Sequence, residues 1–183
     1  MQMPIRQDWS QGCADAHLRA MRRAPRSDLA RLACSYDWSA HPEPVLGWVM
    51  AQRRIELAVA LTVFLRGAPE RFNYMPKRDV PPQHEAEARL LDNICLRINS
   101  GYYLPATPMA APDLPRLENW LAAQKADRAE GSGGRWILDE AIVERVLIQA
   151  AAPAEAMDTR LDTAALRRGR LFALLAPLLR RRA

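Results

Sequence analysis

Residues 55–67 read Ile-Glu-Leu-Ala-Val-Ala-Leu-Thr-Val-Phe-Leu-Arg-Gly, and this stretch decides the fold class. Its large apolar side chains recur at i, i+4, i+7 and i+8, which places them on one face of an α-helix: Leu57, Leu61, Phe64 and Leu65. Gly67 stands where a helix commonly ends. The apolar run is about half of the ~20 residues that a membrane span needs. The pattern therefore predicts a core helix.

The same helical period continues outward in both directions. We expect helices over residues 11–24, 28–36, 42–52, 55–66, 81–100, 113–129, 139–152 and 159–181. Prolines and glycines separate them and predict loops over 68–80, 102–111 and 131–134. No run of alternating polar and apolar residues is bounded by turn residues. The sequence therefore predicts an all-α multi-helix bundle or array.

The chain of 183 residues fits one large domain or one domain with an appended helical lobe. Its apolar fraction of 49% and charged fraction of 26% are ordinary for a globular protein. We expect an N-terminal helical core over residues 1–104 and additional helices over 105–183, packed on or beside that core. The seam is expected at 103–112, where prolines gather.

The net charge of +5 belongs to one end of the chain. The last twenty residues hold six arginines and no acid: Arg167, Arg168, Arg170, Arg180, Arg181 and Arg182. The rest of the chain therefore carries a net charge of −1. A basic last helix is usually solvated, with cations that favour its C-terminal dipole. Nucleic-acid binding through this tail is the alternative.

Linear motifs for catalysis and for metal binding are missing. The three cysteines, Cys13, Cys34 and Cys95, include no CxxC pair. His84 and Glu85 begin an HExxH pattern, but Ala88 stands at its last position. The glycines of 131–134 lack the Lys-Ser/Thr of a phosphate-binding loop. We therefore expect no cofactor and no metal, while an enzyme whose site is assembled from distant residues stays an alternative. His17 is expected at the surface or in a cap.

Aromatic and acidic residues form the most distinctive polar cluster of the sequence. They are Tyr36, Asp37, Trp38, Tyr102 and Tyr103. One interpretation is structural: Asp37 or Ser39 caps the next helix, while Trp38 and Tyr36 seal the core at its end. The other interpretation is a patch that a partner contacts, and these five residues are the candidate interaction site.

Four segments together have a recognisable pattern: 32–38 (Leu-Ala-Cys-Ser-Tyr-Asp-Trp), 45–50, the helix 55–64 and 101–103 (Gly-Tyr-Tyr). In these segments the chain resembles a bacterial family called domain of unknown function 4274. The resemblance covers roughly residues 28–104. It implies a helical fold and a bacterial origin, and it implies no activity. Asp37 and Ser39 stand where that family usually has Asn and Asp, so a shared polar site does not follow.

The function most compatible with these observations is a non-catalytic helical module that binds another protein. No apolar leader is visible near Met1, so a cytoplasmic location is expected. The sequence specifies neither the identity of the partner nor an oligomeric state.

Overall fold

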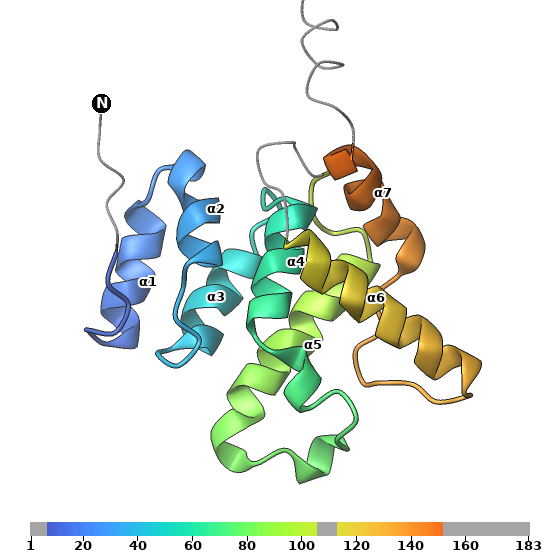
Figure 1. Cartoon of the computed structure of the whole chain (residues 1–183). Helices are drawn as coiled ribbons and strands as arrows, with labels where there is room; N and C mark the ends of the chain where they lie inside the picture. Colours follow the sequence, from blue (N-terminus) through green and yellow to red (C-terminus); the bar gives the residue numbers. More distant parts are fainter. Residues whose placement is uncertain (1–6, 106–112, 152–183) are drawn as a thin grey trace, which may run out of the picture. The chain divides into compact units, whose positions relative to one another are not determined.

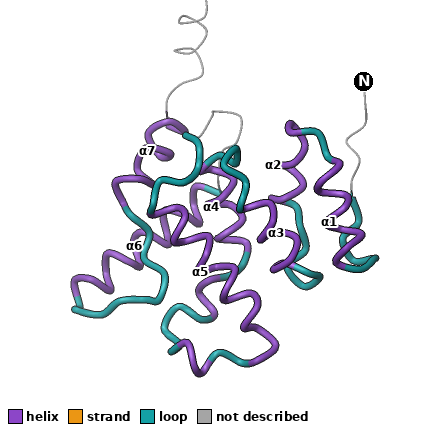
Figure 2. The backbone as a smooth tube through the Cα atoms, turned by 180° about the vertical axis from the view of Figure 1, so that it is seen from behind, coloured by secondary structure: helices purple, strands orange, loops and turns teal. Residues whose placement is uncertain are grey.

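The computed structural model describes residues 7–105 and 113–151. Within these ranges every element of regular secondary structure is a helix, and loops connect the helices (Figures 1 and 2). Seven α-helices occur there: α1 Ala14–Arg23, α2 Arg26–Cys34, α3 Pro42–Met50, α4 Leu57–Arg66, α5 Glu85–Asn99, α6 Leu114–Ala129 and α7 Glu140–Ala151. Three short 3-10 helices lie between α4 and α5: η1 Pro69–Arg71, η2 Lys77–Asp79 and η3 Pro82–His84. The predicted all-α fold class is confirmed.

Helix α4 occupies the centre of the core, as residues 55–67 predicted. Eight of its ten residues are buried, and Phe64 is fully so. In both views α4 and α5 lie in the middle, with α1–α3 on one side and α6 and α7 on the other (Figures 1 and 2). Trp120 of α6 and Trp136 both meet the Phe64 ring edge to face, at centroid distances of 5.5 and 6.4 Å. One core thus includes residues from both sides of the expected seam.

Residues 1–150 form one compact unit and residues 151–183 a second. Helix α6 and most of α7 belong to the first unit, because their aromatic and aliphatic side chains share the core of the preceding helices. The second unit lies almost entirely outside the described residues. The expected helix over 159–181 and the six tail arginines lie there as well.

One isolated pair of backbone hydrogen bonds joins two distant segments. The Leu57 N–H donates to the Leu104 oxygen at 2.8 Å, and the Leu104 N–H donates to the Ile55 oxygen at 3.0 Å. These bonds bring the segment that follows α5 back to the start of α4. In the described residues this is the only strand-like pairing, so the expected loop at 102–105 is ordered by it.

Several helix boundaries differ from the expected ones. Helix α1 begins at Ala14 rather than residue 11, because Ser10 bonds to Asp8 instead of capping the helix. Helix α2 begins at Arg26, directly after Pro25. Asp113 does cap α6 as predicted, accepting the Arg116 N–H at 3.3 Å.

Gly67 ends α4, but for a different reason than the sequence suggested. Its φ of −68° is open to any residue, so a left-handed cap is not what requires glycine. A Cβ atom there would come within 2.6 Å of the Trp38 ring and 2.8 Å of Leu91. Glycine is therefore required by close packing. Within the described helices, none is both long and apolar enough to cross a membrane.

Candidate interaction groove

A groove of about 1020 Å³ opens between the α1–α2 turn, the end of α3 and the start of α4. Its floor is apolar and consists of the side chains of Met21, Leu29, Trp48, Ile55 and Val59. Leu104 closes one side and keeps 46% of its surface exposed. The volume is at the upper end of the ~300–1,000 Å³ range of small-molecule sites. The groove is therefore large enough for side chains of a partner.

Four arginines surround this floor: Arg22, Arg26, Arg53 and Arg54. All four are exposed. The ion pairs among residues 7–105 and 113–151 involve other side chains, so none of these guanidinium groups has a carboxylate partner there. Glu56 is the only acid that lines the groove, and it is engaged in an interaction of its own. The rim is thus strongly cationic.

Aromatic rings hold two of these arginines in place. The Arg22 guanidinium lies 5.6 Å from the Trp48 ring centroid, and that of Arg53 lies 5.9 Å from the Tyr102 ring. Arg97 also contacts Tyr102, at 5.6 Å. Such contacts are worth about 0.5–1 kcal/mol at exposed sites. They orient the cations at the edge of the groove without neutralising them.

Tyr102 and Tyr103, two of the five candidate site residues, satisfy the carboxyl end of α3. Their hydroxyls donate to the carbonyl oxygens of Ala51 at 2.6 Å and Met50 at 3.1 Å. The last carbonyls of a helix have no partner within the helix, so these bonds replace water there. Tyr103 is buried, and burial raises its pKa to about 12. Tyr102 is partly exposed and lines the groove.

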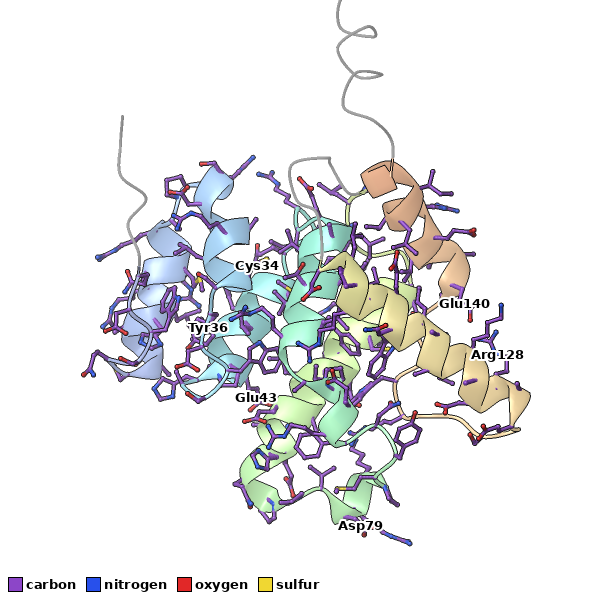
Figure 3. The ribbon with its side chains drawn as sticks, in the orientation of Figure 1. Cys34, Tyr36, Glu43, Asp79, Arg128 and Glu140 are labelled. Carbon is purple, nitrogen blue, oxygen red and sulfur yellow. The ribbon has the colours of Figure 1, made fainter. Side chains whose placement is uncertain are left out.

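The other three candidate residues lie at the opposite end of α3. Tyr36 is fully buried and accepts the N–H of His41, the residue before the helix, at 3.3 Å (Figure 3). Asp37 accepts the Ser39 hydroxyl at 2.7 Å and the Ser39 N–H at 2.8 Å instead of capping α3, and these two bonds lower its pKa. Trp38 is half-buried against Gly67. Because α3 separates the two groups, the five residues do not form one continuous patch.

His17, expected at the surface, is buried beside Tyr36 and Trp9. Its Nε2 lies 2.8 Å from the Gln11 carbonyl oxygen, which can only accept, so Nε2 carries the hydrogen. Its Nδ1 then accepts from the Tyr36 hydroxyl at 2.9 Å. Both ring nitrogens are satisfied, and the imidazole is a structural part of the α1–α3 packing.

The described residues offer little to metal or thiolate chemistry. They contain no cluster of three or more His, Cys, Asp or Glu side chains placed to hold a metal ion. Burial raises the pKa of the Cys34 and Cys95 thiols to about 11, so both are protonated near neutral pH. Cys13 is exposed at the start of α1.

The sequence analysis did not single out the four rim arginines, because the chain without its last twenty residues has a net charge of only −1. The available signal was local: Arg22 near the end of α1, Arg26 at the start of α2 and the adjacent Arg53 and Arg54 before α4 all line one opening.

Comparison of the chain with models of protein families, with curated proteins and with solved structures finds no match. The resemblance to the 4274 family stays a prediction.

Proposed function

We propose that this protein is a non-catalytic interaction module that binds an acidic, amphipathic helix of a partner protein in the groove beside α1 and α2. The observation that carries the proposal is the set of four arginines, unpaired within the described residues, around an apolar floor. An acidic partner would neutralise these cations while its apolar side chains covered Trp48 and Leu29.

The apolar floor distinguishes a peptide from a nucleic acid. Phosphate backbones are bound mainly by cations on an open, polar surface. Here Met21, Ile55 and Val59 lie beneath the cations, and burying one Leu or Phe of a partner against such a floor is worth about 1.5–3 kcal/mol. Amphipathic helices bind in this way, with apolar anchors at i, i+3, i+4 and i+7. An extended peptide gains its affinity by pairing with a sheet edge, and the described residues have no sheet.

The test uses the full chain and a fluorescein-labelled synthetic helix with leucines at helical spacing and glutamates elsewhere. Fluorescence anisotropy measures its affinity over a salt series. We expect saturable binding that weakens with salt, and about tenfold weaker binding to the double variant Arg22→Glu/Arg53→Glu. The matched control is Lys77→Glu/Arg78→Glu, which makes the same change in net charge on the exposed η2 segment, remote from the groove lining. This control should bind nearly as well as the parent.

Three results contradict the proposal. They are equal losses in the two double variants, equal binding of a peptide with lysines in place of the glutamates, and tighter binding to duplex or single-stranded DNA that survives physiological salt. The last result would favour nucleic-acid binding through the basic tail. A variant with glutamine at Arg167, Arg168, Arg170 and Arg180–Arg182 should then lose the DNA affinity.

A further inference from the structure

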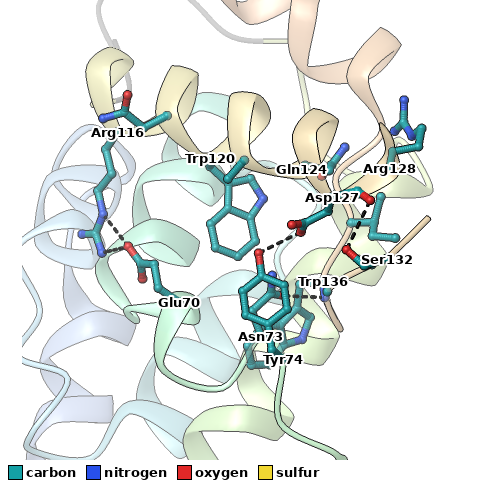
Figure 4. Close-up of a pocket in the computed structure, with 15 residues that line it drawn as sticks. Glu70, Asn73, Tyr74, Arg116, Trp120, Gln124, Asp127, Arg128, Ser132 and Trp136 are labelled. Carbon is teal, nitrogen blue, oxygen red and sulfur yellow. Dashed lines mark hydrogen bonds and ion pairs between the residues drawn. The ribbon is translucent and has the colours of Figure 1, made fainter. Parts of the chain in front are cut away.

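A second cavity, of about 420 Å³, shares no lining residue with the groove. It is bounded by one face of α6, by residues 70–74 and by the loop 132–137 (Figure 4). Asp92 holds this loop by accepting two N–H groups of Arg135 at 2.9 and 2.7 Å, and Asn73 accepts the Trp136 backbone N–H at 3.0 Å. The volume falls within the ~300–1,000 Å³ of small-molecule sites. A cavity whose walls are fixed in advance lowers the entropic cost of binding.

The apolar surface that a ligand can reach in this cavity comes mainly from three residues. Tyr74 is 62% exposed, Ile137 is 47% exposed, and Ala123 is exposed on α6. Trp120 and Trp136 also line the cavity but are buried, so they contribute to its floor. A ligand that covers this surface has an apolar body.

Both arginines of the lining are already paired. Arg116 binds Glu70 at 2.6 Å, and Arg128 binds Glu140 at 2.9 Å. An anionic ligand would have to compete with these carboxylates for the guanidinium groups. The two arginines therefore do not select an anion, and neither ion pair adds net charge to the cavity.

Asp127 is the charged group of the lining that has no counter-charge among residues 7–105 and 113–151. Its Oδ2 accepts the Tyr74 hydroxyl at 2.7 Å, whereas its Oδ1 accepts no hydrogen bond in those ranges (Figure 4). Asp127 lies in the last turn of α6, and Glu130 follows directly after that helix. The carboxyl end of a helix carries partial negative charge and favours a cation nearby.

Tyr74 responds to the negative charge at this end of the cavity. Its hydrogen bond to Asp127 is the main reason that its pKa is raised, and the charges of Asp127 and Glu130 add to the effect. Because the arginines of the lining are paired, the charge of Asp127 is left over. The cavity therefore favours a cation over a neutral molecule or an anion.

We propose that this cavity binds a small organic cation with an apolar body, namely a protonated amine or amidine. An N–H group of the cation donates to the free Oδ1 of Asp127, and the body covers Tyr74, Ala123 and Ile137. The Tyr74 ring adds a cation–π contact, which is favourable at exposed sites. This inference does not depend on the groove or on its partner.

The test compares two planar probes of nearly the same shape, benzamidine and benzamide, at pH 7.5, where only benzamidine is charged. Isothermal titration and saturation-transfer NMR on the full chain measure binding. For fragments of this size we expect a Kd of about 1 mM for benzamidine. Benzamide should bind about three- to tenfold more weakly, the value of one partly exposed, charge-assisted hydrogen bond. Added salt should reduce this difference, because it screens the charge of Asp127.

Two acidic residues of α6 provide the first pair of variants. Asp127→Asn removes the charge and keeps an oxygen that accepts the Tyr74 hydroxyl. Benzamidine should then bind as weakly as benzamide, whose own affinity should not change. The matched control is Glu118→Gln, which removes a carboxylate from an exposed position of the same helix outside the cavity lining. This control should keep the full preference for benzamidine.

Two neighbouring alanines of α6 provide the second pair. Ala123 lines the cavity, whereas Ala122 is exposed on the same helix and does not line it. Ala123→Phe should abolish benzamidine binding by filling the cavity, and Ala122→Phe should leave it unchanged. Equal unfolding midpoints show that both alanine variants fold, and if Ala123→Phe does not fold, the comparison of Asp127→Asn with Glu118→Gln decides. The proposal is overturned by equal affinity for benzamidine and benzamide, by tighter binding of benzoate, by equal effects within either pair of folded variants, or by no saturable binding.

Discussion

Around the groove beside α1 and α2, four arginines lack acidic partners within the described residues, whereas three arginines near α6 and the loop 132–137 pair with carboxylates: Arg116 with Glu70, Arg128 with Glu140 and Arg135 with Asp92. The difference separates polar groups that hold the fold from polar groups available to a partner. Arg135 is 14% exposed and is bonded on two nitrogens by Asp92. Arg53 is exposed, and among the described residues its guanidinium lies over the Tyr102 ring. We expect substitutions in the ion pairs near α6 and the loop 132–137 to lower the free energy of unfolding. Substitutions of the groove arginines should instead lower the affinity for a partner.

The largest effect is expected in the core around α4. Phe64 is fully buried and contacts the rings of Trp120 and Trp136. Phe64→Ala should lower the free energy of unfolding by about 3–5 kcal/mol, through lost burial and the cavity left behind. Trp38→Ala should cost less, because Trp38 is only half-buried. Urea denaturation followed by circular dichroism measures both. An unchanged midpoint for Phe64→Ala would mean that α6 and the loop do not share the core of α4.

The next largest effect is expected at the ion pair between Asp92 and Arg135. Asp92→Asn removes the carboxylate and leaves the largely buried Arg135 cation without its counter-charge. Breaking a buried pair costs about 3–5 kcal/mol, and the 33% exposure of Asp92 reduces this to about 2–3 kcal/mol. The control is Asp79→Asn, whose partner Arg78 is 88% exposed and whose loss should cost less than about 0.5 kcal/mol. Equal shifts of the urea midpoint in both variants would remove the distinction between the regions.

The pH dependence of stability tests whether Cys95 is buried beneath the loop 132–137. Its thiol lies 3.6 Å from the Ile137 oxygen. Burial raises the pKa of Cys95 from 9.0 to about 11, so the folded state retains a proton that the unfolded state releases above about pH 9. The stabilisation is complete below pH 9 and is lost as the pH rises to about 11. We expect a loss of about 2–3 kcal/mol.

Cys95→Ala should remove the part of this decline that Cys95 contributes and leave the part that comes from the buried Cys34 thiol, whose pKa is also raised to about 11. Urea midpoints measured at half-unit steps from pH 8 to 11 follow the effect. A midpoint that rises over this range, or a decline that Cys95→Ala leaves intact, would contradict the burial of the thiol.

The smallest effect is expected at the groove. Arg22→Glu/Arg53→Glu removes two cation–π contacts and relieves repulsion within the rim, so the free energy of unfolding should change by less than about 1 kcal/mol. The same double variant is expected to lose about tenfold in affinity for the acidic helix. A loss of several kcal/mol in stability would show instead that the rim arginines hold the fold.

The helices were predictable because their information is local. The spacing of Leu57, Leu61 and Phe64 and the cap at Asp113 lie within single turns of helix. The end of α4 at Gly67 was predicted as well, but the need for glycine there comes from the Trp38 ring, a neighbour in space that the sequence does not reveal.

The candidate sites could not be read from the sequence, because distant segments build them. Arg22 and Arg26 lie at the same groove as Arg53 and Arg54. The slightly negative net charge of the chain without its last twenty residues gave no sign of this cluster. The glycines of 131–134 predicted a break, but nothing nearby in the sequence showed that Asn73, Asp92 and Gln124 would hold the loop that follows. Tyr102 was singled out for its aromatic character and does line the groove, whereas Tyr36 and Tyr103 are buried.

The hydrogen bonds from residues 102–104 also bear on the order of folding. The hydroxyls of Tyr102 and Tyr103 reach carbonyls 51 and 53 residues earlier in the chain, and Leu104 pairs with the start of α4. Each contact closes a long loop, whose entropic cost grows only as about (3/2)RT ln n. During synthesis the carbonyls of Met50 and Ala51 lack these two tyrosine donors until Tyr103 leaves the ribosome. Helices α1–α4 contact one another without residues 102–104, so the bonds from these residues would be the last to form in the first half of the protein.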